Sequence, residues 1–219
     1  MSIRSTLVDR LFLPKSFDET TSSKPYDFIM PNGYGRNTYS NRETVTVVHR
    51  KRDELGDDIG MFEWLASEGF DPGKPNRSLA MMCDTECART IPIIIGQWEV
   101  MYALWLENPI RYRRQIASFI TIWPLKKNYL ATRGFLLEAK RVADVRGLKT
   151  PLVIAHPKHI QRCFFLAEKI FGQARTTRCA FEERWYDPES IQWQTRGERF
   201  WLFYELCLAR PYDLLHGWL

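Results

Sequence analysis

The chain has 219 residues, of which 45% are hydrophobic and 26% charged, and its formal net charge is +5. This composition is typical of a globular protein with a sizeable core, and the mild positive charge favours anionic partners without selecting nucleic acid over a phosphorylated small molecule. No apolar run reaches the roughly 18 residues of a transmembrane helix, and the first residues lack a signal-peptide pattern. We therefore expect a cytoplasmic protein with no membrane partner, whose five cysteines are reduced thiols.

Residues 1–42 are rich in Ser, Thr, Asn and Gly, and we expect them to form an irregular N-terminal arm. A glycine-rich phosphate loop is not predicted there, because neither GxGxxG nor a P-loop pattern occurs. Residues 43–219 are then expected to form the folded domain. Its first predicted element is a strand over Thr44–His49, because this run alternates and is rich in β-branched residues.

From residue 78 onward, helical spacing alternates with short apolar runs. This alternation predicts a Rossmann-like three-layer α/β/α domain with a mostly parallel sheet. The predicted elements are a helix over Ser78–Arg89, a strand over Ile91–Ile95, an apolar helix from Gln97 to Pro109, a strand over Ala117–Trp123, a helix from Thr132 to Gly147, a strand over Leu152–Ala155, a helix ending at Gly172, a strand over Thr176–Phe181, and a last helix with a Thr195/Glu198 capping box that Pro211 stops.

Two further patterns favour structural over functional roles. Cys83 and Cys87 lie one helical turn apart, but no other ligands complete a metal site, so we expect none. The stretch Pro109–Lys127 interleaves basic and aromatic residues, which raises a nucleic-acid hypothesis. Because no nucleic-acid-binding motif accompanies it, a solvated basic face is the favoured interpretation.

The most informative segment is Thr150–Gly172, which reads as a buried strand, a tight turn and a helix. The turn and the first helical turn carry His156, Lys158, His159 and Arg162. A helix amino terminus favours acidic residues, so basic ones indicate either a bound anion or pairing with acids elsewhere in the chain. On the first interpretation, His156, His159 and Arg162 bind the anion. If the protein is an enzyme, His159 is the expected catalytic acid or base, because a histidine pKa can lie near neutrality.

Other predicted strand ends contribute polar residues to the same edge of a parallel sheet. Gln97 and Glu99 follow the strand over Ile91–Ile95, and Thr132 begins a helix. These three residues are expected to bind a ribose or a similar polyol. Glu99 has an alternative role, because an acid in the first helical turn also suits the helix dipole.

Along this order of elements stand Glu99, Thr132, Val153-Ile154-Ala155, His159, Arg162 and Tyr204-Glu205. With these residues, roughly residues 91–219 resemble the SanA/ElyC/YdcF-like family. The resemblance implies a Rossmann-like three-layer α/β domain with a polar cleft at the strand ends. The chain departs from that pattern, because a glycine-bearing first strand and an S-G-G second strand end are not recognisable, and we expect no membrane anchor of the kind that some members carry.

Two functional hypotheses follow from these patterns. The first is an anionic small-molecule binder, with a nucleotide or an S-adenosylmethionine-like ligand, that acts as a hydrolase or transferase if it is an enzyme. The alternative is a non-catalytic interaction module for a protein or for nucleic acid, with nucleic acid the less favoured partner. The sequence identifies no cofactor, no nucleophile and no oligomeric state.

Overall fold

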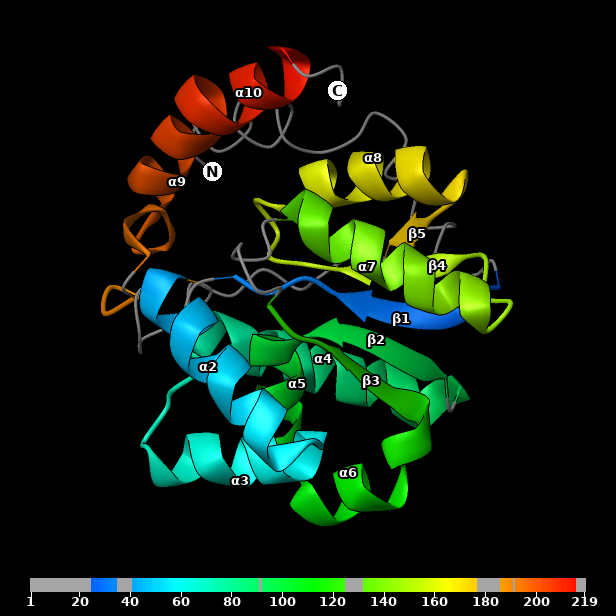
Figure 1. The fold of residues 1–219 in the computed structure, drawn as a ribbon. Helices are drawn as coiled ribbons and strands as arrows, with labels where there is room; N and C mark the ends of the chain where they lie inside the picture. Colours follow the sequence, from blue (N-terminus) through cyan, green and yellow to red (C-terminus); the bar gives the residue numbers. More distant parts are fainter. Residues whose placement is uncertain are drawn as a thin grey trace.

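The computed structural model describes residues 25–34, 41–90, 92–124, 132–176, 186–190 and 192–215. In this part of the chain, five parallel strands form one sheet in the order β3-β2-β1-β4-β5 (Figure 1). The strands are β1 (Phe28–Pro31), β2 (Ile93–Gln97), β3 (Phe119–Ile122), β4 (Pro151–Ile154) and β5 (Arg175–Thr176). The predicted α/β class with a parallel sheet is confirmed.

Helices cover both faces of the sheet. One buried cluster joins α3, α4 and α5 to one face, and a second joins α7 and α8 to the other (Figure 1). The helices that pack on or beside the sheet are α2 (Asn41–Leu55), α3 (Asp58–Ser67), α4 (Lys74–Thr90), α5 (Trp98–Glu107), α6 (Pro109–Arg114), α7 (Thr132–Val145) and α8 (Ile160–Phe171). None of the helices in the described part of the chain has the length and apolarity needed to cross a membrane.

The central strand, β1, lies in the segment that we expected to be irregular. Phe28 pairs with Ile93 of β2 on one side and with Pro151 of β4 on the other. All four residues of β1 are buried. A run of four residues ending in a proline gives little periodic signal, and only the two flanking strands from later in the chain make it a strand. The prediction of an irregular arm is therefore wrong for Phe28–Pro31.

The predicted strand over Thr44–His49 is also wrong, because these residues lie in the 15-residue helix α2. Strand propensity mainly reflects how a side chain fits a pleated, half-buried surface, and tertiary context overrides it. Here the run continues into a charged segment that supports a helix, where Lys51 pairs with Glu54 at 2.6 Å.

The prediction is better from residue 78 onward. Strands β2, β3 and β4 and helices α7 and α8 occur where sequence patterns place them, with boundaries shifted by one or two residues at several ends. Gly147 and Gly172 follow the two helices with φ angles of 70° and 76°, a left-handed conformation that glycine adopts readily. The predicted strand over Thr176–Phe181 is described only at Thr176, which belongs to β5. The rest of it lies outside the described residues.

The last helix differs from its prediction at both ends. It consists of α9 (Glu198–Tyr204), a π-helical turn η5 (Glu205–Ala209) and α10 (Arg210–Leu215), so Pro211 does not stop it. A proline ring crowds the carbonyl four residues earlier, here Cys207, and the wider π-helical turn lies at that point. The capping box is absent because Thr195 belongs to a separate turn, η4 (Trp193–Thr195), and Gly197 precedes α9 without a side-chain cap.

Candidate functional site

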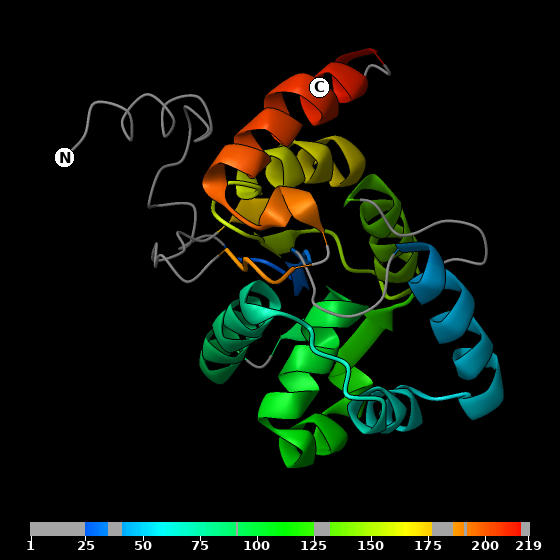
Figure 2. The same cartoon turned by 90° about the vertical axis from the view of Figure 1, so that its left-hand side faces the viewer.

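The candidate site lies where the strand order reverses. The connections from β1 through β2 to β3 run to one side of the sheet, whereas β4, the next strand in the chain, lies on the other side of β1. Ligands of open α/β sheets bind beyond the carboxyl ends of the strands at such a switch point. Figure 2 shows the molecule from the side toward which the strand arrows of Figure 1 point, with α9 lying over this end of the sheet.

The loop after β1 is fixed to three separate elements. Its backbone N–H groups donate in turn from Asn32 to the Ile154 carbonyl at 2.8 Å, from Gly33 to Gln97 Oε1 at 3.1 Å, and from Tyr34 to Asn76 Oδ1 at 2.8 Å. Gln97, predicted to bind ligand, thus positions the loop that leads from β1. Asn76 does the same from α4. Its role was missed because it depends on a contact 42 residues away in sequence.

The turn after β4 carries His156, which is 1% exposed. Its Nδ1 atom accepts a hydrogen bond from the Lys158 N–H at 3.2 Å, so this nitrogen has a lone pair and no proton. The His156 ring also stacks on Tyr34, with the ring centroids 3.8 Å apart and the planes at 10°. The two strands that flank the switch point are therefore joined at their carboxyl ends by a stacked pair of rings.

His159 lies between two of the other predicted site residues. Its Nδ1 is 3.4 Å from Arg162 Nη2, and its Nε2 is 3.1 Å from Thr132 Oγ1. Arginine can only donate, so Nδ1 accepts and the proton of the neutral ring lies on Nε2, which donates to Thr132. Burial, reinforced by Arg162 and His156, lowers the pKa of His159 well below its usual value. At neutral pH the ring is uncharged, so it does not suit a general acid, and its lone pair on Nδ1 faces Arg162.

The positive charges at the start of α8 are matched within the chain. Arg162 Nε lies 3.7 Å from Glu205 Oε2, and Lys158 Nζ lies 3.2 Å from Glu198 Oε1. The guanidinium of Arg162 also lies over the Trp201 ring, 5.9 Å from its centroid. The sequence left two explanations for these basic residues, a bound anion or pairing with acids elsewhere in the chain. The two ion pairs correspond to the second explanation.

Three buried polar groups lie beside these residues without a hydrogen bond among the described residues. They are Asn32 Nδ2, at the end of β1, Tyr34 Oη, and Tyr186 Oη, whose ring centroid lies 4.9 Å from that of His156. Burial, with smaller contributions from Tyr186 and Glu205, raises the pKa of Tyr34 well above its usual value, so its hydroxyl stays a donor. A buried donor without an acceptor is costly, and each such group needs an explanation. Asn32 and Tyr34 were missed because their strand was missed.

Glu99 lies in the first turn of α5, two residues after Gln97, and its side chain is buried. Its place in the helix suits the dipole, and its burial at a strand end suits a ligand-binding role, so both interpretations from the sequence stand. Gln97 connects this end of β2 to the histidines through the loop that carries Gly33 and Tyr34.

The other reactive or charged groups of the described residues are buried, dispersed or paired. Cys163 follows Arg162 in α8, but burial raises its pKa, so it is a protonated thiol and no activated nucleophile. In the part of the chain that the structure describes, no three His, Cys, Asp or Glu side chains are grouped to hold a metal ion. The basic stretch over Pro109–Lys127 is partly neutralised, because Arg111 pairs with Asp84 and Arg113 with Glu63.

These features define a doubly wound, Rossmann-like α/β protein with a buried polar cluster at its switch point. We compared the chain with models of protein families, with curated proteins and with solved structures, and none of the three comparisons finds a significant match. Functional inference therefore depends on the site itself.

Proposed function

We propose that the chain binds a small anionic molecule, of the nucleotide or S-adenosylmethionine class, at the carboxyl ends of β1, β2 and β4. The observation that carries this proposal is the pair of buried groups without partners at the switch point, Asn32 Nδ2 and Tyr34 Oη. A polar ligand beyond the carboxyl ends of β1 and β4 would give both groups a partner. The location is the one at which open α/β sheets bind ligands.

The predicted site residues divide into two roles in this proposal. Arg162 is the cation that meets the anionic group, with His156 beside it on the turn after β4. Thr132 and His159 form a hydrogen-bonded pair that could hold a polyol or accept a proton, as phosphoester hydrolysis or group transfer requires. Gln97 fixes the loop, and Glu99 lies at the neighbouring strand end.

Membership of the SanA/ElyC/YdcF-like family is part of the same proposal. It is supported by the order of elements from β2 onward and by three matching residues, Thr132, His159 and Arg162, which are in contact. The family's polar cleft at the strand ends agrees with the site proposed here.

Isothermal titration calorimetry with AMP, ATP and S-adenosylmethionine tests the binding function. We expect one of these ligands to bind the wild type and to bind Arg162→Ala at least about tenfold more weakly, because a hydrogen bond to a charged group contributes about 1.5–3 kcal/mol. His159→Ala should weaken it too. Arg113→Ala removes the same charge from exposed helix α6 and is the matched control. Equal affinity in wild type and Arg162→Ala would remove this assignment.

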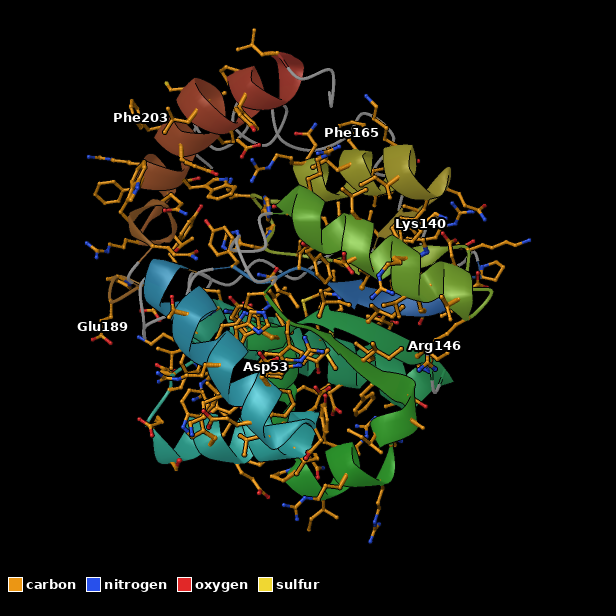
Figure 3. The ribbon with its side chains drawn as sticks, in the orientation of Figure 1. Asp53, Lys140, Arg146, Phe165, Glu189 and Phe203 are labelled. Atoms are coloured by element: carbon orange, nitrogen blue, oxygen red, sulfur yellow. The ribbon has the colours of Figure 1, made fainter. Side chains whose placement is uncertain are left out.

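A second candidate function, a non-catalytic module that binds a protein, is favoured by the apolar surface of the C-terminal helices. Figure 3 shows Phe203 on the outer side of α9, and its side chain is 57% exposed. Clustered exposed apolar residues mark interaction surfaces. The exposed apolar residues of this stretch are Trp193, Phe200, Phe203, Leu206, Leu208, Tyr212 and Leu215. Light scattering of wild type and Phe203→Ser, without ligand, would show association that depends on this surface.

A further inference from the structure

The segment after Gly197 covers the turn between β4 and α8. We name α9 and η5, Glu198–Ala209, the C-terminal cap. Three polar contacts hold its inner face on the turn: Glu198 pairs with Lys158 at 3.2 Å, Trp201 Nε1 donates to the Lys158 carbonyl at 3.1 Å, and Glu205 pairs with Arg162 at 3.7 Å. The cap is therefore attached here partly by polar groups that a polar ligand could replace. Its Trp201 ring is also buried, with its centroid 4.9 Å from that of the Tyr34 ring, and belongs to the apolar core cluster.

Glu205 occupies the position at which an external anion would meet Arg162. The guanidinium is bounded by the rings of Trp201 and Tyr204, at 5.9 and 5.8 Å, and by His159 Nδ1 at 3.4 Å. The Glu205 side chain is 1% exposed and that of Arg162 is 11% exposed, so the pair is shielded from water. The sequence raised the hypothesis of a bound anion beside Arg162. In the structure, the negative charge beside Arg162 is the carboxylate of Glu205.

The energetics of such a pair permit exchange. Burying two charges requires the removal of their water, and this offsets most of their attraction, so a buried ion pair gives little net stabilisation. A ligand phosphate or carboxylate presents to Arg162 the same kind of charged acceptor as Glu205 does. Replacing one acceptor by the other leaves Arg162 paired and returns Glu205 to water.

We propose that Glu205 is a built-in competitor for the anion: an anionic ligand displaces it from Arg162, and the C-terminal cap then leaves the turn after β4. The inference rests on the proposed binding function and adds the way in which that site is closed. The cap shuts the site until an anion of sufficient affinity arrives. The outward-facing Phe203 and its neighbours move with the cap, so ligand binding and the position of this apolar surface are linked.

Hydrogen–deuterium exchange of the full chain without ligand tests the closing contact. Glu205→Gln keeps the shape of the side chain and removes its charge. It should raise exchange of the amides in Glu198–Ala209 at least about tenfold, while exchange in α5 is unchanged. Glu198→Gln is the matched control, because Glu198 pairs with a base of the same turn but is 50% exposed, and it should leave exchange nearly as in the wild type.

Calorimetric titration with inorganic phosphate and with AMP tests the competition. Both probes should bind Glu205→Gln at least about tenfold more tightly than the wild type, because the resident carboxylate no longer competes. Should Glu205→Gln fail to fold, exchange in the wild type decides the matter. Saturating AMP should increase exchange in the C-terminal cap.

The outcomes separate this inference from the binding function. Equal affinity of AMP for wild type and Glu205→Gln, or slower exchange of the cap when AMP is bound, would leave the binding function standing and overturn the competition. Failure of every variant to bind phosphate, AMP or S-adenosylmethionine would overturn both. Tighter binding together with faster exchange of the cap supports both.

Discussion

The carboxyl ends of β2 and β4 both deliver polar residues to the candidate site, yet they are closed in different ways. At β2, Gln97 accepts a hydrogen bond from Gly33 of the adjacent loop, and Gly96 lies against Met101 of the helix that follows. At β4, the turn is covered by a helix from the end of the chain, whose contacts include two ion pairs.

This difference separates the scaffold of the site from its entrance. The β2 end belongs to a tightly packed apolar cluster that includes Trp98 and Phe70, with ring centroids 5.0 Å apart. Trp201 of α9 joins the same cluster from the β4 end, with its ring centroid 4.9 Å from that of Tyr34. The two ends differ in what surrounds these rings, because α9 adds polar contacts on its inner face and has an exposed outer face. If the proposed binding function holds, we expect the ligand to enter at the β4 end.

The largest expected effect comes from a matched pair of buried tryptophans, one at each end. Trp98→Ala should lower the free energy of unfolding by about 3–5 kcal/mol, because it leaves a cavity in a core that cannot collapse. Trp201 belongs to the same buried cluster, but it lies in a helix whose outer face is exposed and which can shift to close the space, so Trp201→Ala should lower this free energy by less. Urea denaturation followed by circular dichroism measures both values. Equal losses in the two variants would show that the cap is part of the same cooperative core.

A smaller effect is expected from glycine substitutions at the two ends. A Cβ atom on Gly96 would lie 2.3 Å from Met101 Sδ and 3.0 Å from Pro31 Cγ. Gly96→Ala should therefore destabilise the protein by about 1–3 kcal/mol, the usual range for overpacking. Gly197→Ala is the matched control, because its backbone is extended and its nearest neighbour, Phe200, is 3.8 Å away. Thermal unfolding of the two variants should separate them clearly, and a similar melting temperature would refute the close packing of β2 on α5.

The smallest effect is a pH dependence that belongs to the β4 end. The pKa of His159 is lowered in the folded chain, so below about pH 6.5 the unfolded chain binds a proton that the folded chain does not. The free energy of unfolding should thus fall as the pH decreases through this region, by up to about 1.4 kcal/mol per pH unit. Above neutral pH this contribution should be constant. His159→Gln should flatten the decline. A wild-type profile parallel to that of His159→Gln would contradict the burial of this ring.

The sequence predicts the fold well from residue 78 onward, and its main errors lie earlier in the chain, at β1 and α2. Strands β2, β3 and β4 are apolar runs bounded by helices with clear spacing, so local patterns suffice. Residues Phe28–Pro31 form strand β1 because β2 and β4 pair with them on either side. The partners of Phe28 lie 65 and 123 residues later in the chain, so no local sequence pattern predicts this strand. Helix α2 shows the opposite error, because a strand-like run lies within a longer helix.

For the candidate site, the sequence indicates which residues lie in it more readily than it indicates which residues they contact. The H-x-x-R spacing correctly places His159 and Arg162 in contact, since residues three apart share a helix face. The role of Thr132 beside them depends on the packing of α7 against α8, and the pairing of Arg162 with Glu205 joins residues 43 positions apart. The sequence shows that the positive charge of Arg162 needs a negative partner, but only the tertiary structure identifies that partner as Glu205.

The register of β1 has a consequence for how the chain folds. The central strand is made first, yet both of its neighbours are distant in sequence, and β4 pairs with it only after residue 151 exists. Contacts between distant residues slow folding, because long loops must close before those contacts form. A nascent chain released before β4 would present one open edge of β1 to other chains, and exposed strand edges promote aggregation. We expect this protein to acquire its sheet late in synthesis and to refold slowly from denaturant.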